Sequence, residues 1–347
     1  MKIGILTFHW ATNYGAILQA YALQEHLKHL GHDVFIIDYK PSIYDFTWKS
    51  ILRYPGNLLH LKKCIGRILK EKKLNEFRRR YLQLTERYCR QEDLGRIVKD
   101  FDVLVSGSDQ VLNPYFTLQG EGCPTSVYYL DFPDAGCIKL GYALSFGCVR
   151  YPDDAAAYAR GFIRGFDRLS VREDSGTDIV SRLGFPDKVV TVPDPTILEG
   201  RRLFGGFDID GKNDGRPYVC VYMLRRALPY PVDNAVYIDE EHKAYTMEEW
   251  LAWIRDSDML VTNSYHGMIM AILFHVPFVV ELEAGEGAGM NDRFLTLLRR
   301  LGMEHRIDRG DNFFHLMETR DIDWEDVDVK LDEYRKEGEC FLKFERI

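Results

Sequence analysis

Short apolar runs alternate with amphipathic segments along the first 198 residues, and most runs end in a polar or glycine-rich tip. The run Lys2–Phe8 has the composition of a buried strand, and apolar residues then recur at helical spacing from Ala16 to Leu30. Gly31 follows in the position where glycine commonly ends a helix. The next apolar run is Val34–Ile37. The pattern predicts a β-α-β unit.

The same alternation continues beyond this unit. Strands are predicted at 102–105, 140–143, 169–171 and 189–192, with helices near 153–166 and 177–183. Strands that alternate with helices predict an α/β fold with a parallel sheet covered on both faces. Ligands of such sheets bind at the carboxyl ends of the strands, where most of the polar tips lie.

Residues 199–216 are rich in glycine and charge and show little periodicity, which predicts a domain boundary. A second α/β unit follows, with strands expected at 218–223, 235–238, 259–261 and 278–282 and helices at 246–256, from 265, and at 292–301. The stretch between Met223 and Ala235 is short for a full α/β layer, so we expect a reduced second domain. The resulting division is an N-terminal domain (1–198), a C-terminal domain (199–320) and a helical tail (321–347).

Residues 41–98 interrupt the alternation and are predicted to form a basic, helical insertion. Between Lys49 and Arg80 there are eleven Lys or Arg residues and two Glu, a local charge of +9 in a chain of net charge −8. Its apolar positions, expected on one side, are Leu58, Leu61, Ile65, Ile68 and Leu69. We favour a helical lid with a solvated basic face over residues 49–80; the alternative is peripheral contact with the anionic inner face of a membrane.

Composition narrows the class of protein. No apolar run approaches the roughly 20 residues needed to cross a bilayer, and the first residues lack the features of a signal peptide. Seven widely spaced cysteines, none in a CxxC pair, fit a reducing cytoplasm. Metal, Walker A and kinase motifs are absent, so we expect neither a metal nor a cofactor. The acidic balance argues against general nucleic-acid binding.

The main candidate site begins where the apolar run Met259–Val261 meets small polar residues. Asn263 and Ser264 precede His266 and Gly267, and an apolar helix follows. This order places an imidazole at a helix N-terminus, where free N–H groups attract anions, and Gly267 leaves room for a ligand near the backbone. The alternative is a histidine that caps its helix or packs in the core. The flanking residues favour a role with a phosphorylated or carboxylated substrate.

Two further positions are candidates for anion binding. Arg172 ends a predicted strand, and its guanidinium could grip a phosphate or carboxylate through two hydrogen bonds. The alternative is a surface ion pair with Glu173 or Asp174. The turn Asn13-Tyr14-Gly15 lies at the mouth of the first helix and could hold an anion or a sugar. The alternative is an ordinary strand-helix turn.

Three loops complete the set of candidate substrate-binding residues. Ser108-Asp109-Gln110 offers a hydroxyl, a carboxylate and an amide to a hydroxyl-rich ligand, although Ser108 or Asp109 could equally cap a helix. Ser145 does not lie in a GxSxG sequence, so a hydrolase triad has weak support. Asp292 is expected to cap the next helix, with Arg293 facing the cleft to bind substrate.

These landmarks, taken in order, resemble the polysaccharide pyruvyl transferase family. The motifs that carry the resemblance are Asn13–Ala16 with Gln19–Leu23, Gly107–Val111 with Asn113, Tyr142–Gly147, Val171–Ser175, Asp194–Thr196, Val261–Gly267, and Asn291–Arg293 with Leu298. Each motif is weak alone, and the ordered set spans residues 1 to about 306.

The resemblance implies two Rossmann-like domains facing a cleft, as in GT-B glycosyltransferases. It implies transfer of a pyruvyl group from phosphoenolpyruvate to two hydroxyls of a cell-surface polysaccharide or lipid-linked sugar, giving a pyruvate ketal and phosphate. His266 matches the general acid and Arg172 a donor-binding residue, while Asp109 or Asp38 would take the hydroxyl proton.

One departure from the family concerns Ser264, which stands where some members have an arginine, so that one cation for the donor is either missing or supplied by Arg293 or Arg225. Two other functions stay open on the same architecture: a glycosyltransferase that uses a nucleotide sugar, and a catalytically inactive protein that binds a sugar or an anion.

Overall fold

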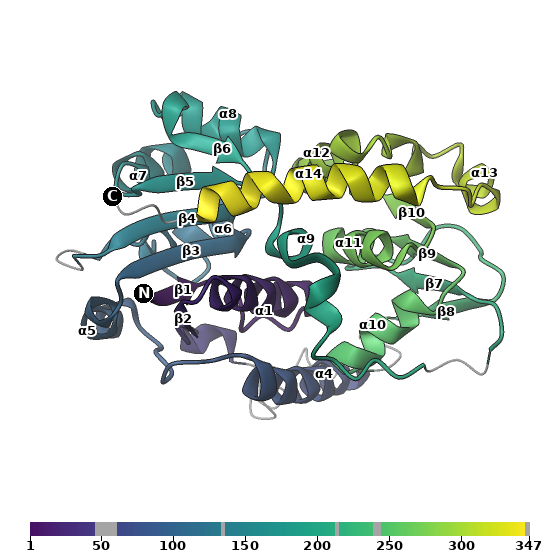
Figure 1. Ribbon diagram of the computed structural model, residues 1–347, viewed down its shortest axis with the longest axis horizontal. Helices are drawn as coiled ribbons and strands as arrows, with labels where there is room; N and C mark the ends of the chain where they lie inside the picture. Colours follow the sequence, from purple (N-terminus) through teal and green to yellow (C-terminus); the bar gives the residue numbers. More distant parts are fainter. Residues whose placement is uncertain (46–60, 133–135, 212–214, 239–243, 344–347) are drawn as a thin grey trace.

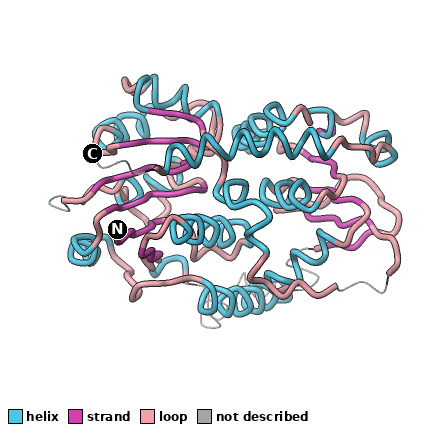
Figure 2. The backbone as a smooth tube through the Cα atoms, viewed as in Figure 1, coloured by secondary structure: helices cyan, strands magenta, loops and turns pink. Residues whose placement is uncertain are grey.

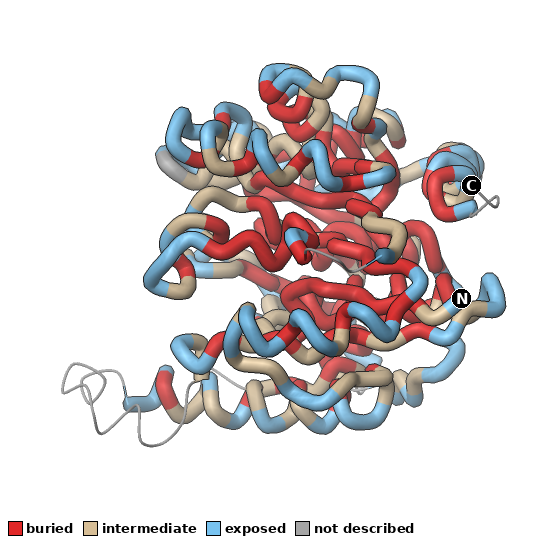
Figure 3. Tube along the Cα trace, turned by 90° about the vertical axis from the view of Figure 1, so that its left-hand side faces the viewer, coloured by how far each residue is buried: buried red, intermediate tan, exposed pale blue. Residues whose placement is uncertain are grey.

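Two parallel sheets, each flanked by helices, lie side by side in the computed structural model, which describes residues 1–45, 61–132, 136–211, 215–238 and 244–343 (Figures 1 and 2). The first sheet is built from residues 2–191 and the second from residues 219–308. Figure 3 shows buried residues in the strands and on the inner sides of the helices, and exposed residues on the outer turns.

The first sheet has six parallel strands in the order β2-β1-β3-β4-β5-β6. Their bounds are β1 Lys2–Leu6, β2 Asp33–Ile36, β3 Val103–Asp109, β4 Ile138–Leu144, β5 Arg168–Val171 and β6 Val189–Thr191. The α-helices that accompany them are α1 Tyr14–His29, α5 Leu94–Ile97, α6 Pro114–Leu118, α7 Asp153–Ile163, α8 Asp174–Arg182 and α9 Pro195–Glu199. The strand order reverses between β1 and β3, and such a reversal opens a crevice at the carboxyl ends of the strands.

The second sheet has five parallel strands in the order β11-β10-β9-β7-β8. Its strands are β7 Val219–Tyr222, β8 Ala235–Tyr237, β9 Met259–Thr262, β10 Phe278–Glu281 and β11 Ile307–Asp308. Its α-helices are α10 Met247–Arg255, α11 Tyr265–Phe274, α12 Asp292–Leu301 and α13 Phe313–Glu318. Residues 223–234 join two parallel strands without a helix, which confirms the predicted reduction of the second domain.

Local sequence accounts for where these helices begin and end. Thr246 and Glu249 form a reciprocal capping box at the start of α10. Gly302, with φ of 71°, ends α12 in the left-handed conformation that glycine adopts easily. Between these signals, α12 buries Phe294 and Leu298, which lie on the same face of the helix.

The two domains share one apolar core, because buried apolar residues of both domains form a single cluster. The Tyr14 ring of α1 stacks on Trp250 of α10 with 5.0 Å between ring centroids, and its hydroxyl donates to the Tyr245 carbonyl at 2.9 Å. The C-terminal helix α14 (Trp324–Leu342) runs across both domains (Figure 1). Its Gly338 lies against Tyr142, where a side chain would overlap the tyrosine hydroxyl.

The insertion supplies a long helix, α4 (Leu61–Tyr81), whose buried side differs from the expected apolar stripe. Leu61 and Leu69 are exposed, and the buried positions are Cys64, Lys70, Leu74, Phe77 and Arg78. The prediction was wrong here because charged side chains take part in the buried contact: Arg78 donates to the backbone carbonyl of His9 at 2.8 Å. Leu58 lies outside the described residues. Within the part of the chain that the structure describes, no helix is both long enough and apolar enough to span a bilayer.

Two acidic residues, the buried Glu281 and the half-buried Asp308, lie side by side on neighbouring strands of the second sheet. Glu281 and Asp308 are register partners on β10 and β11. Burial raises the pKa of Glu281 to about 7, and Asp308 adds to the rise while Arg226 opposes it. A carboxyl group with a raised pKa binds its proton more tightly in the folded state. Its contribution to stability is therefore complete below the unfolded pKa of about 4.3 and is lost as the pH rises through about 7.

Replacing Glu281 with Gln, which resembles the protonated acid, should remove this loss. We expect the Tm of Glu281→Gln, relative to the Tm of the parent chain, to be higher at pH 8 than at pH 5. Thermal unfolding at the two pH values measures it, with Glu318→Gln on the exposed surface as the control for the change of side chain. An equal difference at both pH values would contradict the assignment.

Candidate functional site

His266 lies in the first turn of α11 and reaches from the C-terminal domain to the N-terminal domain. Ser264 caps this helix by accepting a hydrogen bond from the Gly267 N–H at 3.2 Å. The imidazole packs directly on the backbone of Gly15 at the start of α1, where a Cβ atom would overlap the ring. Glycine is therefore required at position 15 by the close approach of the two domains, whatever binds nearby.

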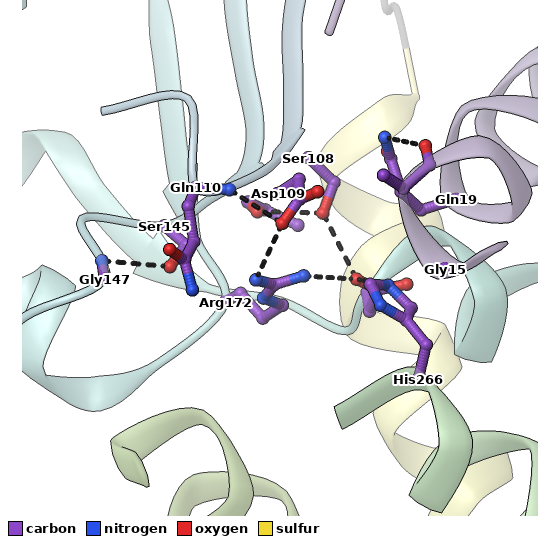
Figure 4. Close-up of polar contacts among 12 residues, drawn as sticks. Gly15, Gln19, Ser108, Asp109, Gln110, Ser145, Gly147, Arg172 and His266 are labelled. Carbon is purple, nitrogen blue, oxygen red and sulfur yellow. Dashed lines mark hydrogen bonds and ion pairs between the residues drawn. The ribbon is translucent and has the colours of Figure 1, made fainter. Parts of the chain in front are cut away.

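The carboxylate of Asp194 joins His266 to Arg172. Its Oδ2 lies 3.4 Å from His266 Nε2 and accepts hydrogen bonds from Arg172 Nη1 at 2.8 Å and from Ser108 Oγ at 3.3 Å (Figure 4). Its Oδ1 accepts from the backbone N–H and the hydroxyl of Thr196 at 3.0 and 2.7 Å. Burial would raise the pKa of Asp194, but the positive charges of His266 and Arg172 outweigh it and hold this pKa well below its usual range. Asp194 is thus a buried anion between two predicted catalytic residues.

Arg172 is fully buried at the end of β5, so it does not form the surface ion pair considered from the sequence. Besides Asp194, it faces Asp109 Oδ1 at 3.6 Å and Glu173 Oε2 at 3.6 Å. These carboxylates outweigh the effect of burial and raise the pKa of Arg172. Asp174 instead forms an exposed ion pair with Arg299. Nε and Nη2 of Arg172, the atoms that face Glu173 and Asp109, are too far from these carboxylates for a hydrogen bond and have no hydrogen-bond partner among the described residues.

A second arginine shares this environment. Arg293, from α12, lies with its Cζ 5.5 Å from the ring centroid of Tyr265, and Arg172 lies 4.8 Å from the same centroid. Burial and the charge of Arg172 lower the pKa of Arg293 to about 10, so it is still a cation at neutral pH. Its Nε is buried without a partner among the described residues. Two cations near one aromatic ring, both with N–H groups that make no hydrogen bond to the described residues, are an arrangement that can bind an anion.

Glu173 supplies the third carboxylate near Arg172. Burial raises the pKa of Glu173, while Arg172 partly opposes the rise. Two arginines (Arg172 and Arg293) and the His266 imidazole thus lie among three carboxylates (Asp109, Glu173 and Asp194). In the described residues, no group of three or more His, Cys, Asp or Glu side chains is arranged to hold a metal ion.

Several other candidate residues have roles in the fold itself. Asn13 caps α1 by accepting from the N–H groups of Gly15 and Ala16 at 2.9 and 3.3 Å. Tyr14 belongs to the domain interface. The amide of Asn263 holds the backbone of Leu224 in place through two hydrogen bonds.

The loops on the N-terminal domain are also internally bonded. Gln110 accepts from the amide of Asn113 at 3.3 Å, and the hydroxyl of Ser145 accepts from the Gly147 N–H at 3.2 Å. A Cβ atom on Gly267 would lie close to the side chains of Thr262 and Tyr222. Packing within the domain therefore explains a glycine at this position without a ligand.

The central residue of the cluster, Asp194, was not among the predicted site residues, and neither were Glu173 and Tyr265 as functional groups. Asp194 precedes Pro195 and Thr196 at the start of α9, a signature of helix capping that the side chain does fulfil. The only sequence signal for a further role was its place in the family motif Asp194–Thr196.

The chain is similar in sequence to one known family. The sequence model of the family described as polysaccharide pyruvyl transferase matches residues 13–281, which is most of the chain. No curated protein matches the chain.

Solved structures with the same architecture have little sequence identity to this chain. The Anabaena protein Alr3699/HepE in complex with UDP-glucose is 8% identical, with 99% of this chain and 96% of that chain covered and a TM-score of 0.50. A Listeria monocytogenes protein provisionally assigned as a UDP-N-acetylglucosamine 2-epimerase is also 8% identical, with 97% and 90% covered and a TM-score of 0.50. These likenesses show a fold of two Rossmann-like domains of the GT-B type.

The geometry predicts that Asp194 stabilises the fold strongly. In Asp194→Asn the amide keeps an acceptor for Thr196 but leaves the buried Arg172 without its closest anion. We expect unfolding to become easier by about 3–5 kcal/mol, as when one partner of a buried ion pair is removed. Ser108→Ala removes a hydroxyl that donates either to the same oxygen at 3.3 Å or to the Ala143 carbonyl at 3.1 Å, and it should cost only about 0.5–1.5 kcal/mol. Urea unfolding measures both, and equal losses would refute the central position of Asp194.

Proposed function

Because the chain belongs to the polysaccharide pyruvyl transferase family, we propose that it moves a pyruvyl group from phosphoenolpyruvate to two hydroxyls of a polysaccharide or lipid-linked sugar. The products are a pyruvate ketal and phosphate. The observation that carries the proposal is the buried cluster in which Arg172 and His266, from different domains, meet on Asp194. Two arginines with unused donors and one imidazole fit an anionic donor that must be protonated.

The donor carries a carboxylate and a phosphate, and the site offers two guanidinium groups. In the proposal, Arg172 binds through Nε and Nη2, because Nη1 is already held by Asp194. These two atoms make no hydrogen bond to the described residues, although each faces a carboxylate, Glu173 or Asp109, at 3.6 Å. Arg293 supplies the second cation through its unpartnered Nε. Arg293 is favoured over Arg225 for this role because Arg225 is exposed and its Nη1 donates to the sulfur of Met290. Paired N–H groups of this kind suit both carboxylate and phosphate oxygens.

His266 is the proposed general acid. When a sugar hydroxyl attacks C2 of phosphoenolpyruvate, the methylene carbon C3 must gain a proton, and the imidazole delivers it. Positioned acid catalysis of this kind typically contributes about 10²–10⁴-fold to the rate. Asp194 and the backbone of Gly15 hold the ring from two sides, so the proton donor is fixed in the absence of substrate.

The test of this function is the release of phosphate from phosphoenolpyruvate in the presence of a panel of glycan acceptors. His266→Ala should lower turnover at least 10²-fold, because the proton donor is lost. It should leave the stabilisation by phosphoenolpyruvate in a thermal-shift assay largely intact, because both arginines remain. His305→Ala, at an exposed position, is the control.

Unchanged turnover in His266→Ala would remove the histidine from the mechanism. Stabilisation by UDP-glucose and not by phosphoenolpyruvate would favour the nucleotide-sugar glycosyltransferase.

A finer part of the proposal concerns where the acceptor is met. The exposed side of α4 carries Lys62, Lys72, Arg79 and Arg80, with Glu76 as the exposed acid. Leu61 and Leu69 are exposed on the same helix. Basic side chains near an anionic bilayer contribute about 1 kcal/mol each. Because exposed leucines accompany the basic residues on this helix, we now prefer the membrane alternative to the solvated face favoured from the sequence, and we infer that this face contacts the cytoplasmic membrane surface, where a lipid-linked acceptor would be available.

Vesicle sedimentation tests this contact. The chain should sediment with vesicles of phosphatidylserine and phosphatidylcholine, and a variant with Gln at positions 62, 72, 79 and 80 should lose most of this binding, because the charge that attracts the bilayer is gone. A variant with Gln at the exposed positions 96, 99, 182 and 336 carries the same change of net charge elsewhere. Equal sedimentation of the two variants, or none by the parent chain, would exclude the α4 face as the membrane contact.

A further inference from the structure

The proposed reaction needs a group that accepts the proton of the attacking hydroxyl, and three carboxylates face Arg172. Their side chains differ in access to solvent: Asp194 is 0% exposed, Glu173 4% and Asp109 16%. A general base must be reached by the hydroxyl from which it takes the proton. Of the three, Asp109 is therefore the one that an incoming sugar can contact.

Hydrogen bonding separates the same three groups. Both oxygens of Asp194 are engaged, with Thr196 on one side and Arg172 and Ser108 on the other. In Asp109, Oδ1 accepts from the Gln110 N–H at 2.9 Å and lies 3.6 Å from Arg172. Its Oδ2 accepts no hydrogen bond from the described residues. One oxygen thus fixes the side chain while the other remains available for a proton.

The backbone of Asp109 is unusual. It is the last residue of β3 and has φ of 73°, a left-handed conformation that a non-glycine residue adopts at a cost. Pairing with Leu144 of β4 holds this residue in the sheet. As a result, the side chain lies beside Arg172 at the edge of the cluster (Figure 4).

Asp38, the other carboxylate considered for this step, is already committed to a different contact. It lies 3.0 Å from Nε2 of His9, whose Nδ1 faces the Thr7 carbonyl at 3.1 Å. Burial would raise the pKa of Asp38, but the hydrogen bond and charge of His9 outweigh it and lower that pKa. Asp38 therefore serves as the partner of a buried histidine.

We propose that Asp109 is the general base that accepts the proton of the acceptor hydroxyl; this rests on the proposed function. As the hydroxyl oxygen forms a bond to C2 of phosphoenolpyruvate, its proton passes to Asp109 Oδ2, and the C2=C3 electron pair takes the proton of His266. In the second step another hydroxyl bonds to C2 and the C2–O bond to phosphate breaks. After the reaction the proton on Asp109 returns to His266 through solvent, so one hydroxyl proton is balanced by the proton gained in the new methyl group and the other leaves with phosphate.

The left-handed backbone allows two informative substitutions. Glycine and asparagine both tolerate φ of 73°, so Asp109→Gly and Asp109→Asn should fold. Turnover should fall at least 10²-fold in both variants, while the thermal shift with phosphoenolpyruvate persists. Formate should raise the turnover of Asp109→Gly at least tenfold, since a small carboxylate can occupy the space that the side chain has left. Glu173→Gln is the matched control, a removed carboxylate beside the same arginine, and formate should not restore its activity.

Two results would overturn the assignment of Asp109 as the base and leave the proposed function intact. One is a turnover of Asp109→Asn within threefold of the parent, and the other is a loss of turnover in Asp109→Gly that formate does not relieve. A parent chain that neither binds phosphoenolpyruvate nor releases phosphate from it overturns the proposed function and the base assignment with it. Loss of folding in one variant leaves the other to decide.

Discussion

The contact of Asp194 with both Arg172 and His266 is the interaction on which the rest of the site depends. It places a carboxylate and a guanidinium in a fully buried position, where an unpaired charge of either sign would be expensive. Each group is tolerated because the other is within hydrogen-bond distance. Since Asp194 comes from the end of the first domain and His266 from the second, their distance of 3.4 Å is set by how the domains pack.

The apolar interface fixes this distance. Tyr14 stacks on Trp250, and Gly15 lets the imidazole of His266 approach the first turn of α1. Helix α14 spans the two domains, and its Gly338 packs close to Pro193, the residue before Asp194. Separating the domains would expose part of a shared core at a cost of roughly 25 cal/mol for each Å² of apolar surface. The proposed proton donor, His266, and the proposed anion-binding residue, Arg172, are therefore held together by the fold itself.

The pattern of apolar and polar residues was enough to predict most helices and strands, because each of them is determined largely by residues close together in the sequence. The bounds of the Asp292–Leu301 helix are as predicted, and the absence of a helix after β7 was predicted from the length of the loop. The expectation that Asp292 caps this helix was wrong, because Asn291 occupies the cap position and Asp292 instead accepts from the Ser175 N–H at 2.8 Å. The site was harder because its contacts join distant residues. Asp194 has the sequence signature of a helix cap, and only the fold shows that its other oxygen serves Arg172. The buried side of α4 was mispredicted for a related reason, since Arg78 is buried by virtue of partners that hydrophobic periodicity does not report.

The balance of charge in the cluster explains how such a polar site can exist without its ligand. Arg172, Arg293 and His266 face Asp109, Glu173 and Asp194, so the buried region carries no large excess of charge of either sign. The anionic donor that we propose would add negative charge, and this excess would be relieved if a carboxyl group took up a proton. Burial already raises the pKa of Glu173, which makes protonation of that residue the least costly response. The two arginines can then turn their unused N–H groups to the donor, while Asp194 keeps the imidazole in place.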